Sequence, residues 1–136
     1  MKSDRLKEHM LENGAKITSL QSRISETVKL RDKSPEGLRE WKDACAEFHR
    51  RYSTLAFPGG YDGALERIVA GDEDAMEAAI CFLECRPYFF RSGYMFKDIL
   101  RKTKRAPLSL DQADRLRKVE SKLSEWRAHK LATRET

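Results

Sequence analysis

Helix breakers are few in this sequence of 136 residues, with only four prolines and seven glycines. Sustained alternation of polar residues with valine, isoleucine, threonine or aromatic residues, the pattern of a half-buried strand, is also missing. The compact apolar stretches AAICFL and YFF lie in helix-like contexts. Charged residues, in contrast, make up 36% of the chain, well above the usual value of about one quarter. These features predict a small all-α fold of five or six helices, in a single domain over residues 1–136.

Long apolar runs are missing as well. No segment approaches the roughly 18 apolar residues of a membrane span, and the opening MKSDRLKEHM lacks the apolar core of a secretion signal. Cysteine is scarce and odd in number, at Cys45, Cys81 and Cys85. Without an export signal, an odd number favours free thiols in a reducing compartment over a disulfide framework. We therefore expect a cytoplasmic protein with no membrane partner.

Local signatures of catalysis are absent from the sequence, which has no nucleophile elbow and no HExxH motif. We expect no catalytic residue, no enzymatic activity and no cofactor. One metal hypothesis remains, because Cys45 and His49 are four residues apart, as are Cys81 and Cys85, so each pair would share a helical face. Together they would make a Cys3His donor set that suits zinc. We favour the alternative, in which the cysteines pack as small hydrophobic residues.

The first part of the chain has the pattern of a helical hairpin over about residues 3–55. The following residues recur every three or four positions, as in a coiled-coil seam: Leu6, Met10, Asn13, Ile17, Leu20, Ile24 and Thr27. Such a seam needs a partner helix, so self-association through the first helix is one expectation. The Asn13–Gly14 pair favours a turn, which predicts a short first helix and a longer one over about 15–32.

A second helix of the hairpin is predicted to begin at Ser34, as N-cap, with Pro35 in the first helical position. Its apolar residues form one stripe: Leu38, Trp41, Cys45, Phe48 and Tyr52. The stretch FPGGYDG then predicts a loop over residues 57–63, which separates the hairpin from a C-terminal helical half over about 61–132.

The C-terminal half is predicted to contain three or more helices. A short helix should end at Gly71, and Asp72 should cap an alanine-rich helix that ends near Pro87. This arrangement resembles one hairpin of the HEAT-type helical repeats over about residues 61–104, although the chain has no second copy. A capping box formed by Ser109 and Gln112 starts the last helix. Its predicted apolar face consists of Leu116, Val119, Leu123, Trp126 and Leu131.

The stretch RPYFFRSGYM, residues 86–95, allows two local structures. In one, a helix runs from about Tyr88 to Lys104, and Gly93 lets a neighbouring helix approach its packing face of Phe89, Gly93, Phe96 and Leu100. In the other, Ser92 caps a helix that starts at Gly93, and the rings of PYFF fill the core. In both structures the stretch has mainly a packing role, since aromatic clusters beside proline are usually structural.

Charge is strongly segregated along the C-terminal half. Residues 61–85 contain seven acidic residues and one arginine, whereas residues 86–105 contain seven basic residues and one aspartate. A segregated basic strip is typical of a surface for an acidic partner. However, helix dipoles account for part of the pattern, and the two segments could neutralise each other if they packed together.

We expect a non-catalytic protein-binding module, such as an adaptor, a regulator or an inhibitor of the immunity-protein type. The partner-binding residues predicted from the sequence are Arg86, Tyr88, Arg91, Tyr94, Lys97, Arg101, Lys104 and Arg105. The alternative is a nucleic-acid-binding regulator that uses the basic strip 86–105 and Arg115 on phosphates.

Overall fold

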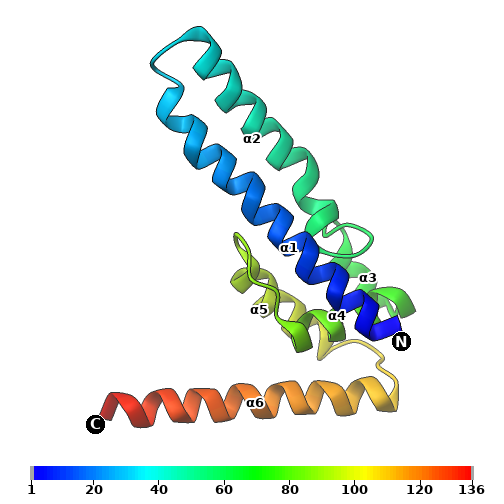
Figure 1. Ribbon diagram of the computed structural model, residues 1–136. Coiled ribbons are helices and arrows are strands. Elements are labelled where there is room, and N and C mark those ends of the chain that lie inside the picture. Colours follow the sequence, from blue (N-terminus) through cyan, green and yellow to red (C-terminus); the bar gives the residue numbers. More distant parts are fainter. Residues whose placement is uncertain (1, 136) are drawn as a thin grey trace.

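The computed structural model describes residues 2–135, and every regular element in that range is helical (Figure 1). The all-α prediction with six α-helices is confirmed. The elements are α1 (Lys2–Thr27), the short 3-10 helix η1 (Val28–Leu30), α2 (Pro35–Ala56), α3 (Ala64–Ala70), α4 (Glu73–Cys85), α5 (Ser92–Thr103) and α6 (Leu110–Glu135). Within the described residues, no helix combines the length and apolar character needed to cross a membrane.

Helices α1 and α2 form a long antiparallel hairpin that extends away from the other helices (Figure 1). Helix α1 packs against both α2 and α4, and Met10, Ile17 and Leu20 of its seam are buried within the chain. Self-association through this helix stays a prediction. The start of α2 is as predicted, because the Gly37 N–H donates to the Ser34 hydroxyl at 2.9 Å. The apolar stripe of α2 was only partly correct.

The buried face of α2 is centred on Ala44 and Phe48, whereas Leu38 is exposed and Trp41 and Cys45 are half-buried. Phe48 is thus the member of the predicted stripe at the centre of the buried face, whereas Leu38, Trp41 and Cys45 lie at its edge.

The predicted break at Asn13 and Gly14 is wrong, since α1 runs without interruption from Lys2 to Thr27. Both residues are buried. A Cβ atom at position 14 would lie 3.3 Å from Cδ2 of Phe89 and 3.7 Å from the carbonyl oxygen of Tyr88. Glycine is thus used here for close approach of another segment and not for a turn, and packing of the surrounding helix outweighs its low helix propensity.

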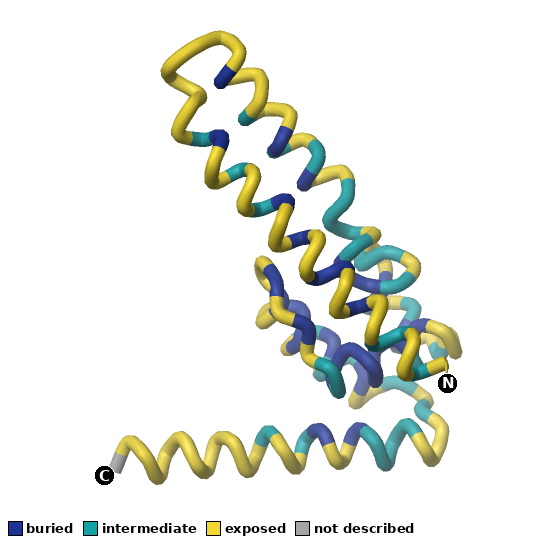
Figure 2. Tube along the Cα trace, in the orientation of Figure 1, coloured by how far each residue is buried: buried dark blue, intermediate teal, exposed yellow. Residues whose placement is uncertain are grey.

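The core lies where α4 packs against α1, α3, α5 and α6. Figure 2 shows the buried residues concentrated in this region. The predicted helix ends are confirmed: α3 ends before Gly71, which has a φ of 89°, and the Ala75 N–H donates to the Asp72 carboxylate at 2.8 Å. The largest fully buried side chains include Phe57, Ile80 and Phe82.

Helix α6 begins with the predicted capping box, in which Ser109 and Gln112 each donate a backbone N–H to the other's side chain at 3.1 Å. Its apolar face is shorter than predicted. Leu116 and Val119 are buried, but Trp126 is 52% exposed and Leu131 is 60% exposed. Residues 124–134 of α6 are all exposed, as Figure 2 shows.

Candidate binding cleft between α1, α5 and α6

The segment between α4 and α5 is an irregular linker followed by a helix that starts at Ser92. This agrees with the second of the two structures expected for RPYFFRSGYM, except that Ser92 is not an N-cap: its hydroxyl accepts the Phe89 N–H at 3.1 Å. Phe89 is buried against the rings of Tyr52 and Phe82, whereas Tyr88 is 92% exposed. The linker therefore fixes one ring in the core and presents another to solvent.

Two arginines flank this linker in left-handed backbone conformations, with φ of 45° at Arg86 and 66° at Arg91. Arg86 ends α4, where its N–H donates to the Phe82 carbonyl at 2.8 Å. The Tyr52 hydroxyl donates to the Phe90 carbonyl at 2.7 Å and so holds the linker against α2. These contacts fix the directions in which both arginine side chains leave the backbone.

The packing face expected for α5 is wrong at Gly93. The buried residues of α5 are instead Ser92, Met95, Phe96, Ile99 and Thr103. Gly93 is exposed, and no atom lies within 4 Å of the position that a Cβ would occupy. Met95 and Ile99, on the opposite side of α5, are buried in the core. Gly93 therefore faces away from the core, toward an open cleft.

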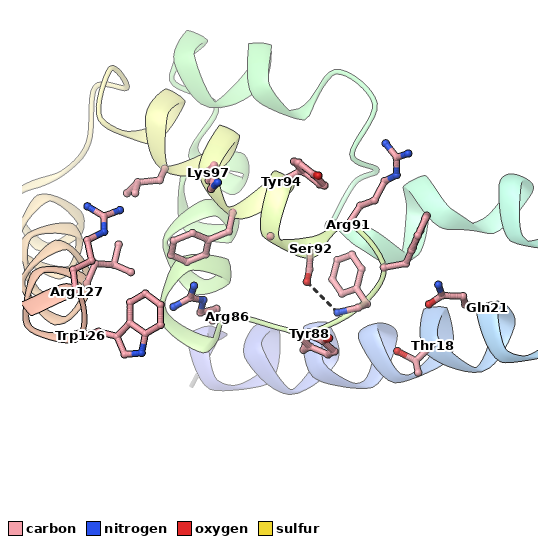
Figure 3. Close-up of a pocket in the computed structure, with 16 residues that line it drawn as sticks. Thr18, Gln21, Arg86, Tyr88, Arg91, Ser92, Tyr94, Lys97, Trp126 and Arg127 are labelled. Atoms are coloured by element: carbon pink, nitrogen blue, oxygen red, sulfur yellow. Dashed lines mark hydrogen bonds between the residues drawn. The ribbon is translucent and has the colours of Figure 1, made fainter. Parts of the chain in front are cut away.

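This cleft has a volume of about 790 Å³ and lies between α1, the linker, α5 and α6 (Figure 3). Thr18 and Gln21 of α1 contribute one wall, and Leu123, Trp126 and Arg127 of α6 contribute another. Four cationic side chains line it, and no aspartate or glutamate does. Its cationic residues are Arg86, Arg91, Lys97 and Arg127.

The cationic and aromatic side chains are interleaved. The Arg86 guanidinium carbon lies 4.7 Å from the ring centroid of Phe96 and 6.0 Å from that of Trp126, within the range of cation–π attraction. Figure 3 shows Lys97, Arg86, Trp126 and Arg127 gathered toward one end of the cleft. Within the described residues, neither Lys97 nor Arg127 has an ion-pair partner, so both charges are available to a ligand.

The structure divides the predicted partner-binding residues into two groups. Five line the cleft: Arg86, Tyr88, Arg91, Tyr94 and Lys97. The other three lie outside it. Arg101 pairs with Asp98 at 3.1 Å and Lys104 with Glu120 at 3.8 Å, whereas Arg105 lines a separate groove beside α3.

Sequence reasoning missed the contributions of α1 and α6 to the cleft. Trp126 was assigned to the apolar face of the last helix, and its periodic position does favour that interpretation. Thr18, Gln21 and Arg127 carry no local signal, because their place in the cleft depends on how α1 and α6 pack around the linker.

The acidic helix α4 is neutralised by residues other than the basic strip. The Arg115 guanidinium of α6 bonds Glu77 at 2.9 Å and Glu84 at 2.6 Å, and Lys7 of α1 lies 3.0 Å from Glu84. Arg115 therefore holds helices together and is not free for phosphate contacts. The acidic residues of α4 likewise do not cancel the charge of the cleft.

Partial burial favours a higher pKa for Glu77, but hydrogen bonds from Ser3, Arg115 and Gln112 outweigh it and lower the pKa from 4.5 to about 2. The carboxylate thus stays charged far below neutral pH. Its partners come from α1 and α6, so Glu77 connects three helices.

The zinc hypothesis is not supported. Among residues 2–135, no group of three or more histidine, cysteine, aspartate or glutamate side chains is placed to hold a metal ion. Cys45 and His49 lie on α2, whereas the Cys81 thiol lies near Glu77 and Arg115, and Cys85 contacts Met10. Burial raises the pKa of Cys81, and it raises that of Cys85 to about 11, so both thiols are protonated at neutral pH.

No protein-family model matches this chain, and neither a curated protein nor a solved structure matches it. The HEAT-like hairpin stays a sequence-level resemblance.

Proposed function

We propose that this chain is a non-catalytic module that binds another protein, as an adaptor, regulator or inhibitor does, and that the cleft is its recognition surface. The observation that carries the proposal is that four cationic side chains and several exposed aromatic rings line the same cleft, which no carboxylate lines. Tyr88, Tyr94 and Trp126 are 92%, 70% and 52% exposed. Arginine, tyrosine and tryptophan are the residue types that contribute most at protein interfaces.

The partner surface is acidic, because an acidic group is the complement of these cations. The whole chain has a formal net charge of +5, which also favours encounter with an acidic protein. Lys97 lies on α5 and Arg127 on α6, and both line the cleft (Figure 3). A single acidic segment could therefore contact α5 and α6 together.

A nucleic-acid partner is the second candidate, since exposed tyrosines beside cations also suit stacking of bases. Its weakness is that the strip 86–105 is not one continuous surface. Arg101 and Lys104 are paired with Asp98 and Glu120, and these two pairs interrupt the row of cations within residues 86–105 that a phosphate backbone would contact. We favour the protein partner for this reason.

A pull-down from nuclease-treated native lysate tests the proposal. The tagged wild-type chain is compared with Lys97→Glu/Arg127→Glu, which reverses two charges in the cleft. A matched control, Lys102→Glu/Arg105→Glu, reverses one lysine and one arginine outside it. We expect a protein that the wild type and the control recover and the cleft variant loses. A parallel pull-down is made without nuclease, and cleft-dependent recovery that occurs only in that untreated sample would contradict the proposal and favour a nucleic-acid partner.

A further inference from the structure

The side chains that line the cleft offer more hydrogen-bond donors than acceptors. Arginine, lysine and the tryptophan ring can only donate, and these types supply five of its lining side chains. Two carbonyls of the linker are already occupied: the Phe89 carbonyl accepts the Ser92 N–H, and the Phe90 carbonyl accepts the Tyr52 hydroxyl. The acceptors among the lining side chains are the Gln21 amide and hydroxyl groups, and the linker carbonyls of residues 86–88 add a few more. A ligand that fits this inventory brings acceptors and few unpaired donors.

An extended peptide does not meet that condition. Each of its residues except proline carries a backbone N–H that needs an acceptor when it is buried. Such peptides commonly obtain acceptors from the edge of a β-sheet, and residues 2–135 contain no strand. A helix satisfies its own backbone N–H groups and presents only side chains to the cleft.

The size of the cleft also suits a helix. A volume of about 790 Å³ is close to that of about two helical turns, with a diameter of about 10 Å and a length of about 10 Å. Phe96, Leu100 and Leu123 line the cleft and are buried or half-buried, so they can receive one apolar residue. Lys97 lies on α5 and Arg127 on α6, so carboxylates spaced three or four residues apart could reach both.

Resting on the proposed function, we infer that the partner element is an acidic amphipathic helix, seated between α1 and α6 with its apolar side chain on the floor of the cleft and its carboxylates toward Arg86, Lys97 and Arg127. Charge complementarity favours an acidic partner, and the excess of side-chain donors and the lack of a strand edge in residues 2–135 favour a helix over an extended chain. The arrangement is the helix-in-groove mode of recognition.

A display experiment tests the inference with defined probes. A library of random 16-residue peptides is selected on the wild-type chain, and the most enriched sequence is synthesised in three forms: unchanged, with a central proline, and with its acidic residues changed to amides. Binding to the wild type, to Lys97→Glu/Arg127→Glu and to Lys102→Glu/Arg105→Glu is measured by fluorescence anisotropy. A labelled 20-nucleotide oligo-dT serves as the nucleic-acid probe.

We expect enriched peptides with acidic residues three or four positions apart around an apolar residue. The central proline, the amide form and the cleft variant should each weaken binding by about tenfold or more, because a proline inside a helix alone is that costly. The control variant should change binding less than about twofold. Circular dichroism of both proteins confirms that the variants are folded.

The outcomes separate the inference from the proposed function. Acidic peptides that need the cleft but tolerate the central proline would overturn the helical partner and leave the protein-binding function intact. Absence of any peptide whose binding depends on the cleft would overturn the inference. If oligo-dT then bound in a cleft-dependent manner, the proposed function would be overturned as well.

Discussion

Acid should destabilise this protein through Glu77, and the size of the effect follows from the structure. The Glu77 carboxylate accepts hydrogen bonds from Ser3 at 2.8 Å, Gln112 at 3.2 Å and Arg115 at 2.9 Å. These bonds hold its pKa at about 2 in the folded chain, against 4.5 for the unperturbed group. A group with a lowered pKa stabilises the fold above its unfolded pKa, and that stabilisation is lost as the pH falls toward its folded pKa.

The shift from 4.5 to about 2 corresponds to about 3 kcal/mol at neutral pH, at about 1.4 kcal/mol per pKa unit. About 2 kcal/mol of this should be lost between pH 7 and pH 3, because the unfolded chain takes up the proton in this range and the folded chain does not. Glu84 adds a loss in the same direction, since hydrogen bonds from Arg115 and Lys7 outweigh its desolvation and lower its pKa.

Urea unfolding followed by circular dichroism, at pH 7 and at pH 3, measures the free energy of unfolding for the wild type and for Glu77→Gln. Other carboxylates titrate in both proteins, so the difference between their pH dependences isolates Glu77. We expect Glu77→Gln to lose about 2 kcal/mol less than the wild type over this interval. Equal losses would show that Glu77 titrates as an ordinary surface carboxylate, and the reasoning would be refuted.

Three further predictions concern the backbone and the thiols. Gly14→Leu should lower the free energy of unfolding by about 1–3 kcal/mol, because Phe89 already lies 3.3 Å from the position of a Cβ at residue 14. Gly93→Ala should raise the free energy of unfolding by up to about 1 kcal/mol, because no atom lies within 4 Å of its Cβ position and alanine has the higher helix propensity. Thermal melts that rank these two variants in the reverse order would contradict the packing described above. Arg91→Gly should be neutral or stabilising by up to about 1 kcal/mol, since its φ is 66°, and a larger loss in urea unfolding would show that the arginine itself holds the linker. Cys81 and Cys85 should react with a thiol reagent at pH 7 far more slowly in the folded chain than in urea, and equal rates would refute their burial as protonated thiols.

The helical class and most helix ends could be predicted because they depend on residues close together in the chain. Ser34 caps α2 and Asp72 caps α4 through hydrogen bonds that span three residues. The capping box of Ser109 and Gln112 is equally local. Such contacts form whatever the rest of the chain does, so composition, spacing and capping residues are sufficient to locate them.

The candidate site could be predicted only in part. Arg86, Tyr88, Arg91, Tyr94 and Lys97 were selected because they are close in sequence, and all five line the cleft. Arg101, Lys104 and Arg105 follow them in the same basic strip but lie elsewhere. The difference arises because a helix turns its residues to different sides and because Asp98 and Glu120 occupy two of these cations.

By itself, therefore, the sequence determined an all-α chain with its caps, its loops and the segregation of its charges. Only the tertiary structure decided whether Gly14 would be a turn or a close contact, and whether Trp126 would be buried or exposed. It also decided that Arg115 would pair with Glu77 and Glu84, which leaves the cations of the cleft free. These outcomes depend on which distant segments meet, and packing free energy outweighs the local preferences of single residues.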